Sequence, residues 1–130
     1  MLYMQLIRRY DLPFTSVSIA YRGSTIEIPQ VLVDTGSAST VISADLVDSI
    51  GIFPLPDDRI VTIRGVGGSE VVFRRRVDFL QVGEKELTNF ELEVGGMDYG
   101  FEINGILGMD FLVEAKAIIN LHTMSLTFDS

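Results

Sequence analysis

The stretch from residue 31 to residue 40 reads Val31-Leu32-Val33-Asp34-Thr35-Gly36-Ser37-Ala38-Ser39-Thr40. An apolar, β-branched run ends at Asp34, and a small hydroxyl residue and a glycine follow at once. Such a run is typical of a short buried strand, and Gly36 permits a tight turn behind the acid. The stretch therefore predicts one carboxylate that is held rigidly where the strand leaves its sheet, at the mouth of a cleft.

Composition places the chain among globular proteins with a core made of strands. The 130 residues suffice for one domain, residues 1–130, but not for two lobes, and 47% of them are hydrophobic. Valine and isoleucine are plentiful, good helix formers are sparse outside two short stretches, and 12 glycines separate short apolar runs. This pattern predicts an all-β domain.

The charge balance and the missing residue types exclude several kinds of site. A net charge of −8 disfavours binding to nucleic acid backbones and to anionic membranes. Without cysteine the chain has no disulfide, thiolate nucleophile or zinc–thiolate site. We interpret the single histidine, His122, as a turn or surface residue, and the basic run Arg74–Arg76 as a solvated strand or a surface ion-pair site. No cofactor or metal is implied.

The N-terminus and the hydropathy pattern bear on where the protein works. Residues 1–9 lack the basic start and the long apolar run of a signal peptide, and no stretch approaches the length of a membrane span. We therefore expect a cytoplasmic protein with no membrane contact, unless the chain is trimmed from a longer precursor.

Glycines, prolines and charged turns divide the chain into short strands. The second predicted strand should end at Pro29, because proline cannot donate a ladder hydrogen bond. Two short helices are predicted, over residues 44–49 with Ser43 as N-cap and over 111–115 with Asp110 as N-cap. The predicted strands cover residues 17–21, 25–28, 31–33, 60–64, 70–74, 77–82, 87–94, 103–108, 116–120 and 125–128.

A faint internal repeat relates two parts of the chain. Residues 31–47 and 103–114 both run from an apolar strand through a sharp turn into a short helix. Gly108 stands near the position that Asp34 occupies in the first part. The repeat predicts a pseudo-symmetric barrel of two similar halves, with the acid kept in only one. Because carboxylate chemistry on amide bonds usually needs two groups, we expect two copies of the chain to build one active site.

Four features of the chain occur in a fixed order: Val33-Asp34-Thr35-Gly36-Ser37 after an apolar strand, the glycine-rich hairpin at residues 65–68, Ile106-Leu107-Gly108 before a short helix, and a length half that of a two-lobed pepsin. Together they resemble the retroviral-type (retropepsin-like) aspartic proteases, including their cellular and bacterial single-domain relatives. The resemblance covers residues 14–128. It implies a closed β-barrel with one or two short helices and a flap hairpin, acting as a homodimeric aspartic endopeptidase on extended peptide or protein segments.

The resemblance also implies roles for the residues around the acid. Asp34 from each of two subunits would form the catalytic dyad. Thr35 would grip the opposing loop through its hydroxyl, and Gly36 would leave room for its backbone N–H beside the carboxylate. Ser37 would donate a hydrogen bond to the outer oxygen of Asp34, and we also expect it to bind substrate.

The resemblance further implies that two other segments contact other chains. The chain ends, residues 2–7 and 126–128, would supply strands of the subunit interface. The tip of the flap would pair with an extended peptide as an added strand. The flap residues that we expect to bind substrate are Val66, Gly67 and Gly68.

Other interpretations stay open at this point. The chain could be a catalytically silent, dimeric peptide-binding domain that keeps the fold, or a half-module that pairs with a different chain or a second domain. Asp34-Thr35-Gly36 could also be an ordinary turn after a strand. The intact set of three residues favours the enzyme, because a silent relative has no physical need for it.

Overall fold

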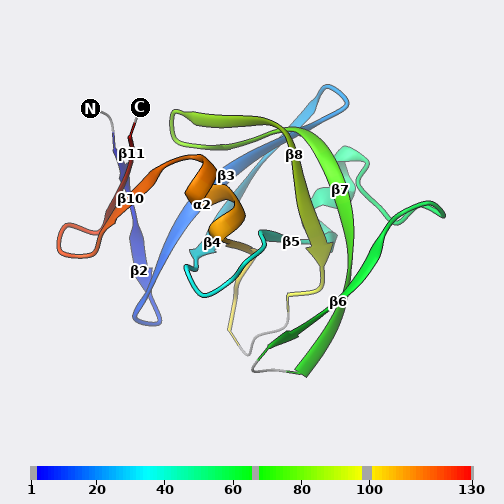
Figure 1. The fold of residues 1–130 in the computed structure, drawn as a ribbon, viewed down its shortest axis with the longest axis horizontal. Helices are drawn as coiled ribbons and strands as arrows, with labels where there is room; N and C mark the ends of the chain where they lie inside the picture. Colours follow the sequence, from blue (N-terminus) through cyan, green and yellow to red (C-terminus); the bar gives the residue numbers. More distant parts are fainter. Residues whose placement is uncertain (1–2, 66–67, 98–100, 130) are drawn as a thin grey trace.

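The computed structural model describes residues 3–65, 68–97 and 101–129, and most of these lie in strands (Figure 1). The helices are short: α1 (Ala44–Val47), the 3₁₀ helix η1 (Asp48–Ile50) and α2 (Met109–Glu114). In the described residues no helix is long and apolar enough to cross a membrane. The predicted all-β class is confirmed. The strands are β1 (Met4–Gln5), β2 (Ile7–Arg9), β3 (Leu12–Tyr21), β4 (Ser24–Val33), β5 (Val41–Ser43), β6 (Ile60–Gly65), β7 (Gly68–Val82), β8 (Lys85–Gly95), β9 (Gly105–Leu107), β10 (Ala117–Asn120) and β11 (Ser125–Phe128).

Hydrogen bonding closes most of the sheet into a ring. Across the described part of the chain, eight strands form one sheet in the order β2-β3-β4-β9-β5-β8-β7-β6. An additional antiparallel pairing joins β3 to β7, with Ile19 opposite Leu80. The six strands from β3 to β7 in this order therefore form a closed ring, which agrees with the predicted barrel. Strands β1, β11 and β10 form a separate sheet at the end of the molecule where both termini lie (Figure 1).

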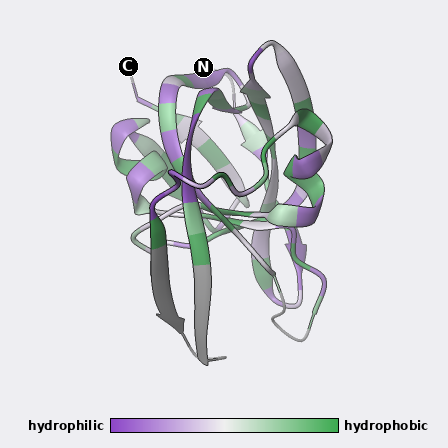
Figure 2. Cartoon of the chain, turned by 90° about the vertical axis from the view of Figure 1, so that its right-hand side faces the viewer, coloured by the Kyte–Doolittle hydropathy of each residue, from purple (hydrophilic) through white to green (hydrophobic). Residues whose placement is uncertain are grey.

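The two faces of the ring sheet carry different clusters of apolar residues. Neighbouring residues of a strand point to opposite faces, and apolar and polar bands alternate along the ribbon in Figure 2. On β4, Val31 and Val33 belong to the main core, whereas Leu32 between them packs on the other face. Asp34 follows Leu32 by two residues, so alternation assigns it to the same face as Leu32. The smaller cluster there contains Phe14, Ile103 and Ile106.

Pro29 does not end a strand, so this prediction from the sequence was wrong. Strand β4 continues through Pro29 to Val33, and its register with β3 shifts between Thr15 and Val17. Gln30, next to the proline, has a positive φ of 58°. A bulge tolerates proline because the ladder is already interrupted where the N–H is missing.

Strand β7 is one element of 15 residues where two strands were predicted. It pairs with β6 up to Phe73 and with β8 from Phe73 onward. The strand continues through the basic run Arg74–Arg76, because two of its arginines lie opposite glutamates on β8. Arg74 lies opposite Glu93, and Arg76 lies opposite Glu91.

The third arginine of the run, Arg75, is buried, so the prediction of a solvated or surface site was wrong for this residue. Its guanidinium lies 2.7 Å from the Oδ2 of Asp58 and donates a hydrogen bond to the Phe53 carbonyl at 2.9 Å. It also donates to the Tyr21 hydroxyl at 3.2 Å. Arg75 therefore links the loop before β6 to the root of the glycine-rich hairpin, which is the end of the β6–β7 pairing near Phe73.

Neither predicted helix cap forms as expected. Ser43 precedes α1 but makes no side-chain capping hydrogen bond. Helix α2 begins at Met109, so Gly108 occupies the cap position and Asp110 lies in the first turn. Asp110 accepts a hydrogen bond from the Phe111 N–H, and its remaining contacts reach the loop after Asp34.

The two ends of the chain pair with each other. Met4 of β1 lies opposite Leu126 of β11, and Gln5 lies opposite Ser125. Leu126 is fully buried within the same chain. The segments that we expected to form subunit-interface strands are therefore already hydrogen-bonded within one chain, with β1 and β10 as the outer strands of their sheet.

Candidate active site

Asp34 emerges at the end of two adjacent parallel strands. Val33 of β4 lies opposite Leu107 of β9, and the Asp34 N–H donates to the Leu107 carbonyl at 3.0 Å. Asp34 and Gly108 thus leave neighbouring strands at equivalent points, as the internal repeat predicted. This arrangement fixes the backbone of Asp34 to the middle of the ring sheet, while its side chain remains partly exposed.

Backbone groups of the following turn hold the carboxylate of Asp34. The Gly36 N–H donates to Asp34 Oδ1 at 2.9 Å, and the Ser37 N–H donates to the Asp34 carbonyl at 3.2 Å. A Cβ atom at Gly36 would lie 3.1 Å from Asp34 Oδ1, a tight contact that glycine avoids. The turn therefore fixes the orientation of one carboxylate oxygen and leaves the other available for chemistry.

A buried hydrogen-bond network braces the loop that follows Asp34. Thr40 is fully buried, and its N–H and Oγ1 donate to the two carboxylate oxygens of Asp110 at 3.0 and 2.7 Å. Its Oγ1 also accepts a hydrogen bond from the Gly108 N–H at 3.0 Å. A Cβ atom at Gly108 would lie 2.5 Å from the Ser39 carbonyl oxygen, so only glycine allows this approach. The loop is thereby held against the first turn of α2.

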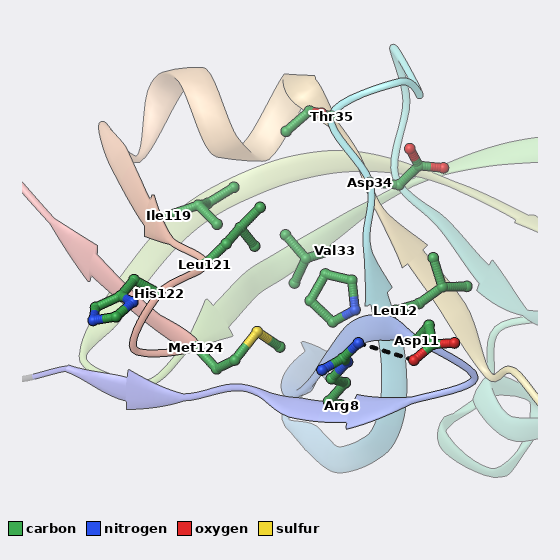
Figure 3. Close-up of a pocket in the computed structure, with 11 residues that line it drawn as sticks. Arg8, Asp11, Leu12, Val33, Asp34, Thr35, Ile119, Leu121, His122 and Met124 are labelled. Carbon is green, nitrogen blue, oxygen red and sulfur yellow. Dashed lines mark hydrogen bonds and ion pairs between the residues drawn. The ribbon is translucent and has the colours of Figure 1, made fainter.

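A cavity of about 620 Å³ opens beside the acid (Figure 3). Figure 3 shows that Val33 and Asp34 point to opposite sides of the chain, so the aspartate lies at the border of this cavity. At the rim, Arg8 lies 2.9 Å from Asp11 in an exposed ion pair. The lining residues are Arg8, Asp11, Leu12, Pro13, Val33, Asp34, Thr35, Ile119, Leu121, His122 and Met124.

The structure brings only some of the predicted site residues together. Asp34 and Thr35 line the cavity, and Gly36 lies directly behind them. The Ser37 hydroxyl does not donate to Asp34 as expected but to the Ser39 carbonyl at 2.8 Å. Gly68 pairs with Gly65 in the glycine-rich hairpin. Val66 and Gly67 lie outside the described residues.

Several residues around the acid had no signal in the sequence. The hairpins β2–β3 and β10–β11 contribute most of the cavity wall, although they are distant from Asp34 along the chain. His122 lies in the second of these turns, as predicted, but it also lines the cavity. Thr40 was missed as well, although a polar residue directly before an apolar strand was a weak hint. Across residues 3–65, 68–97 and 101–129, no group of three or more His, Asp or Glu side chains is placed to hold a metal ion.

Comparisons with known proteins agree with this geometry. A family model described as gag-polyprotein putative aspartyl protease matches residues 25–114. DNA damage-inducible protein 1 of Yarrowia lipolytica is 31% identical over 98 residues, which make up 75% of this chain and 24% of that protein. The chain thus spans about a quarter of the length of this curated relative.

The fold has a solved counterpart that covers nearly the whole chain. The crystal structure of a retropepsin-like aspartic protease from Rickettsia conorii matches with a TM-score of 0.65 and 19% sequence identity. The match covers 98% of this chain and 99% of that one, and at this identity it shows the fold. Together with the family model over residues 25–114, the fold and the Asp34 turn show that the chain belongs to the retropepsin-like aspartic proteases.

Proposed function

We propose that the chain is an aspartic endopeptidase whose active site forms from Asp34 of two copies of the chain. The observation that carries this proposal is the single carboxylate at the end of β4, oriented by the Gly36 N–H at 2.9 Å and bordering a cavity of about 620 Å³. The equivalent position on β9 holds Gly108, which has no side chain to offer. A second copy, related by a two-fold axis, would bring the second aspartate to the first.

The proposed chemistry needs a water molecule between two carboxyl groups. One group takes a proton from the water as it attacks the peptide carbonyl, and the other protonates the carbonyl oxygen and then assists the departing nitrogen. The pair must share one proton, because two like charges about 3 Å apart do not both persist. The free oxygen of Asp34 would face this water, while Oδ1 remains fixed by Gly36.

The remaining predicted residues would position the partner and the substrate. Thr35, exposed at the cavity wall, would contact the loop of the second subunit. Ser37 would shape the turn through its hydrogen bond to Ser39 rather than contact the carboxylate. An extended peptide or protein segment would lie under the glycine-rich hairpin and pair with its backbone as a strand. The hairpin residues proposed for this contact are Val66, Gly67 and Gly68.

Digestion of a diverse peptide mixture, read by mass spectrometry, tests this proposal. Wild type and Asp34→Asn are compared at several pH values, and the oligomeric state of each sample is measured. Asp45→Asn is the matched control, because Asp45 is an exposed acid on α1, outside the cavity. We expect cuts by wild type and by Asp45→Asn that disappear in Asp34→Asn, with a rate that changes between acid and near-neutral pH.

Three outcomes would contradict the proposal in different ways. Cuts that persist in Asp34→Asn would assign the activity to another group or to a contaminant. No cuts by a dimeric wild type would leave a peptide-binding domain that keeps the fold. No cuts by a monomeric wild type would favour a half-module that needs a different chain, in keeping with a curated relative of which the matched residues make up only 24%.

A further inference from the structure

A buried carboxylate outside the proposed dyad lacks a hydrogen-bond donor. Glu93 of β8 is 4% exposed, and its Oε1 is buried without a hydrogen-bond partner in the described part of the chain. Its Oε2 lies 3.7 Å from the Nε of Arg74, an ion-pair distance that is too long for a hydrogen bond. Buried carboxylates are normally satisfied by donors, and an unsatisfied one is costly to keep. Glu93 is therefore short of at least one donor.

The strand register places Glu93 on the same face of the sheet as Asp34. Leu32 of β4 lies opposite Ile106 of β9, Ile106 lies opposite Val41 of β5, and Val41 lies opposite Glu93 of β8. Residues opposite one another on neighbouring strands point to the same face. Leu32 and Ile106 share the smaller apolar cluster, away from the main core. The alternation along β4 gives Asp34 this same face, so the two carboxylates face the same side.

Glu93 also lies at the root of the glycine-rich hairpin. Its opposite residue on β7 is Arg74, immediately beyond Phe73, where the pairing between β7 and β6 ends. Three strand spacings, about 14 Å, separate Leu32 from Glu93, and Asp34 lies two residues farther along the chain, so Asp34 and Glu93 are about 16 Å apart. An extended peptide covers this span with about five residues. A peptide held under the hairpin with its cleaved bond at Asp34 would thus bring one of its side chains to Glu93.

We propose that Glu93 recognises an arginine or lysine side chain of the peptide substrate, about five residues from the cleaved bond. This inference rests on the proposed function. A basic side chain would supply both the missing N–H donor and the opposite charge that a buried carboxylate requires. Arg74 can give way, because its side chain is 31% exposed and its contact with Glu93 is long. The net charge of −8 also favours the approach of basic segments.

A neighbouring pair of residues provides a matched control. Glu91 precedes Glu93 by two residues on the same strand and lies 3.6 Å from Arg76, which is opposite to it. This pair has the same chemistry, but its side chains are 43% and 54% exposed. Water satisfies Glu91, so its carboxylate has no comparable need for a donor from a substrate.

The test uses peptides in which each position up to five residues on either side of the cleaved bond carries either arginine or methionine. The ratio of kcat/KM for the arginine peptide over the methionine peptide is measured for wild type, Glu93→Gln and Glu91→Gln. At one position we expect wild type to prefer arginine by about tenfold or more, as a hydrogen bond between charged groups implies. Glu93→Gln should bring this ratio close to unity, whereas Glu91→Gln should leave it unchanged.

A second variant separates substrate recognition from a structural ion pair. Arg74→Gln removes the internal cation that competes for Glu93, so it should raise the preference for arginine above the wild-type ratio. A purely structural pair between Arg74 and Glu93 would lower stability in both variants without moving this ratio. Thermal unfolding of every variant is measured alongside. If Glu93→Gln does not fold, the arginine preference of Arg74→Gln still tests the role of Glu93.

The outcomes distinguish this inference from the proposed function. If wild type cleaves without a preference for arginine, the role of Glu93 is overturned. The same holds if Glu93→Gln keeps the wild-type preference. In both cases the proposed protease function stands. If no variant cleaves, the proposed function fails. The role of Glu93 is then tested by measuring how the same peptides bind to Asp34→Asn and to Asp34→Asn/Glu93→Gln. Arginine-dependent binding that requires Glu93 upholds the inference, and its absence overturns it.

Discussion

Replacing Thr40 with valine tests whether the buried network holds the loop that carries Asp34. Valine keeps the shape of threonine but removes a hydroxyl that donates to Asp110 Oδ1 at 2.7 Å and accepts from the Gly108 N–H at 3.0 Å. A hydrogen bond to a charged group contributes about 1.5–3 kcal/mol, and a buried unsatisfied N–H costs about 1–3 kcal/mol. Since Asp110 keeps the hydrogen bond from the Thr40 N–H, we expect a loss of about 3 kcal/mol in the free energy of unfolding.

Urea denaturation at one fixed protein concentration measures this loss, because the stability of a dimer depends on concentration. Thr15→Val is the matched control. Thr15 is 3% exposed, but its hydroxyl makes only a 3.4 Å contact with the Ser16 carbonyl. We expect the control to cost less than about 1 kcal/mol. If Thr40→Val costs no more than Thr15→Val, the network does not brace the loop, and the reasoning about Asp110 and Gly108 is refuted.

Two further predictions concern other parts of the framework. Gly108→Ala should cost about 2 kcal/mol or more and slow peptide cleavage, because the new Cβ would lie 2.5 Å from the Ser39 carbonyl oxygen; unchanged thermal unfolding and cleavage would refute this. Arg75→Met should cost about 3 kcal/mol in urea denaturation, because the mostly buried carboxylate of Asp58, 11% exposed, loses its ion-pair partner. Arg76→Met, which breaks an exposed pair, should stay within about 0.5 kcal/mol; equal losses at both arginines would argue against a special role for the buried pair.

The sequence predicted the parts of the fold that local rules determine. Gly23, with φ of 87°, lies between the predicted strands 17–21 and 25–28, and Gly51, with φ of 88°, lies just beyond the helix predicted over residues 44–49. The acid at the end of a buried strand was predicted for the same reason, because alternation and turn chemistry act over a few residues. Pro29 was mispredicted because a bulge depends on the opposing strand, which local rules do not describe.

The site was less predictable where it depends on contacts between distant segments. Thr40 and Asp110 lie 70 positions apart in the sequence, and each looks ordinary within its own segment. Asp110 was correctly placed near the start of a helix, but its partner across the fold decides its role. Arg75 looked like its two neighbours in a basic run, and only the pairing of β7 with β8 directs it toward the interior beside Asp58. The three arginines of the run look alike in the sequence, but the fold buries only Arg75.

Gly108 explains in physical terms why one chain presents one acid. It lies beside Asp34, at the equivalent point of the repeat. Its N–H donates a hydrogen bond to the Thr40 hydroxyl, and a side chain on its Cα would clash with the Ser39 carbonyl. The adjacent Met109 N–H donates to the Ser37 carbonyl at 2.8 Å, so this half of the repeat supports the loop that holds the acid. An aspartate at position 108 would push that loop away before it could pair with Asp34. Under the proposed mechanism, the second carboxylate would then come from another copy of the chain, which is the reason that we propose a dimer.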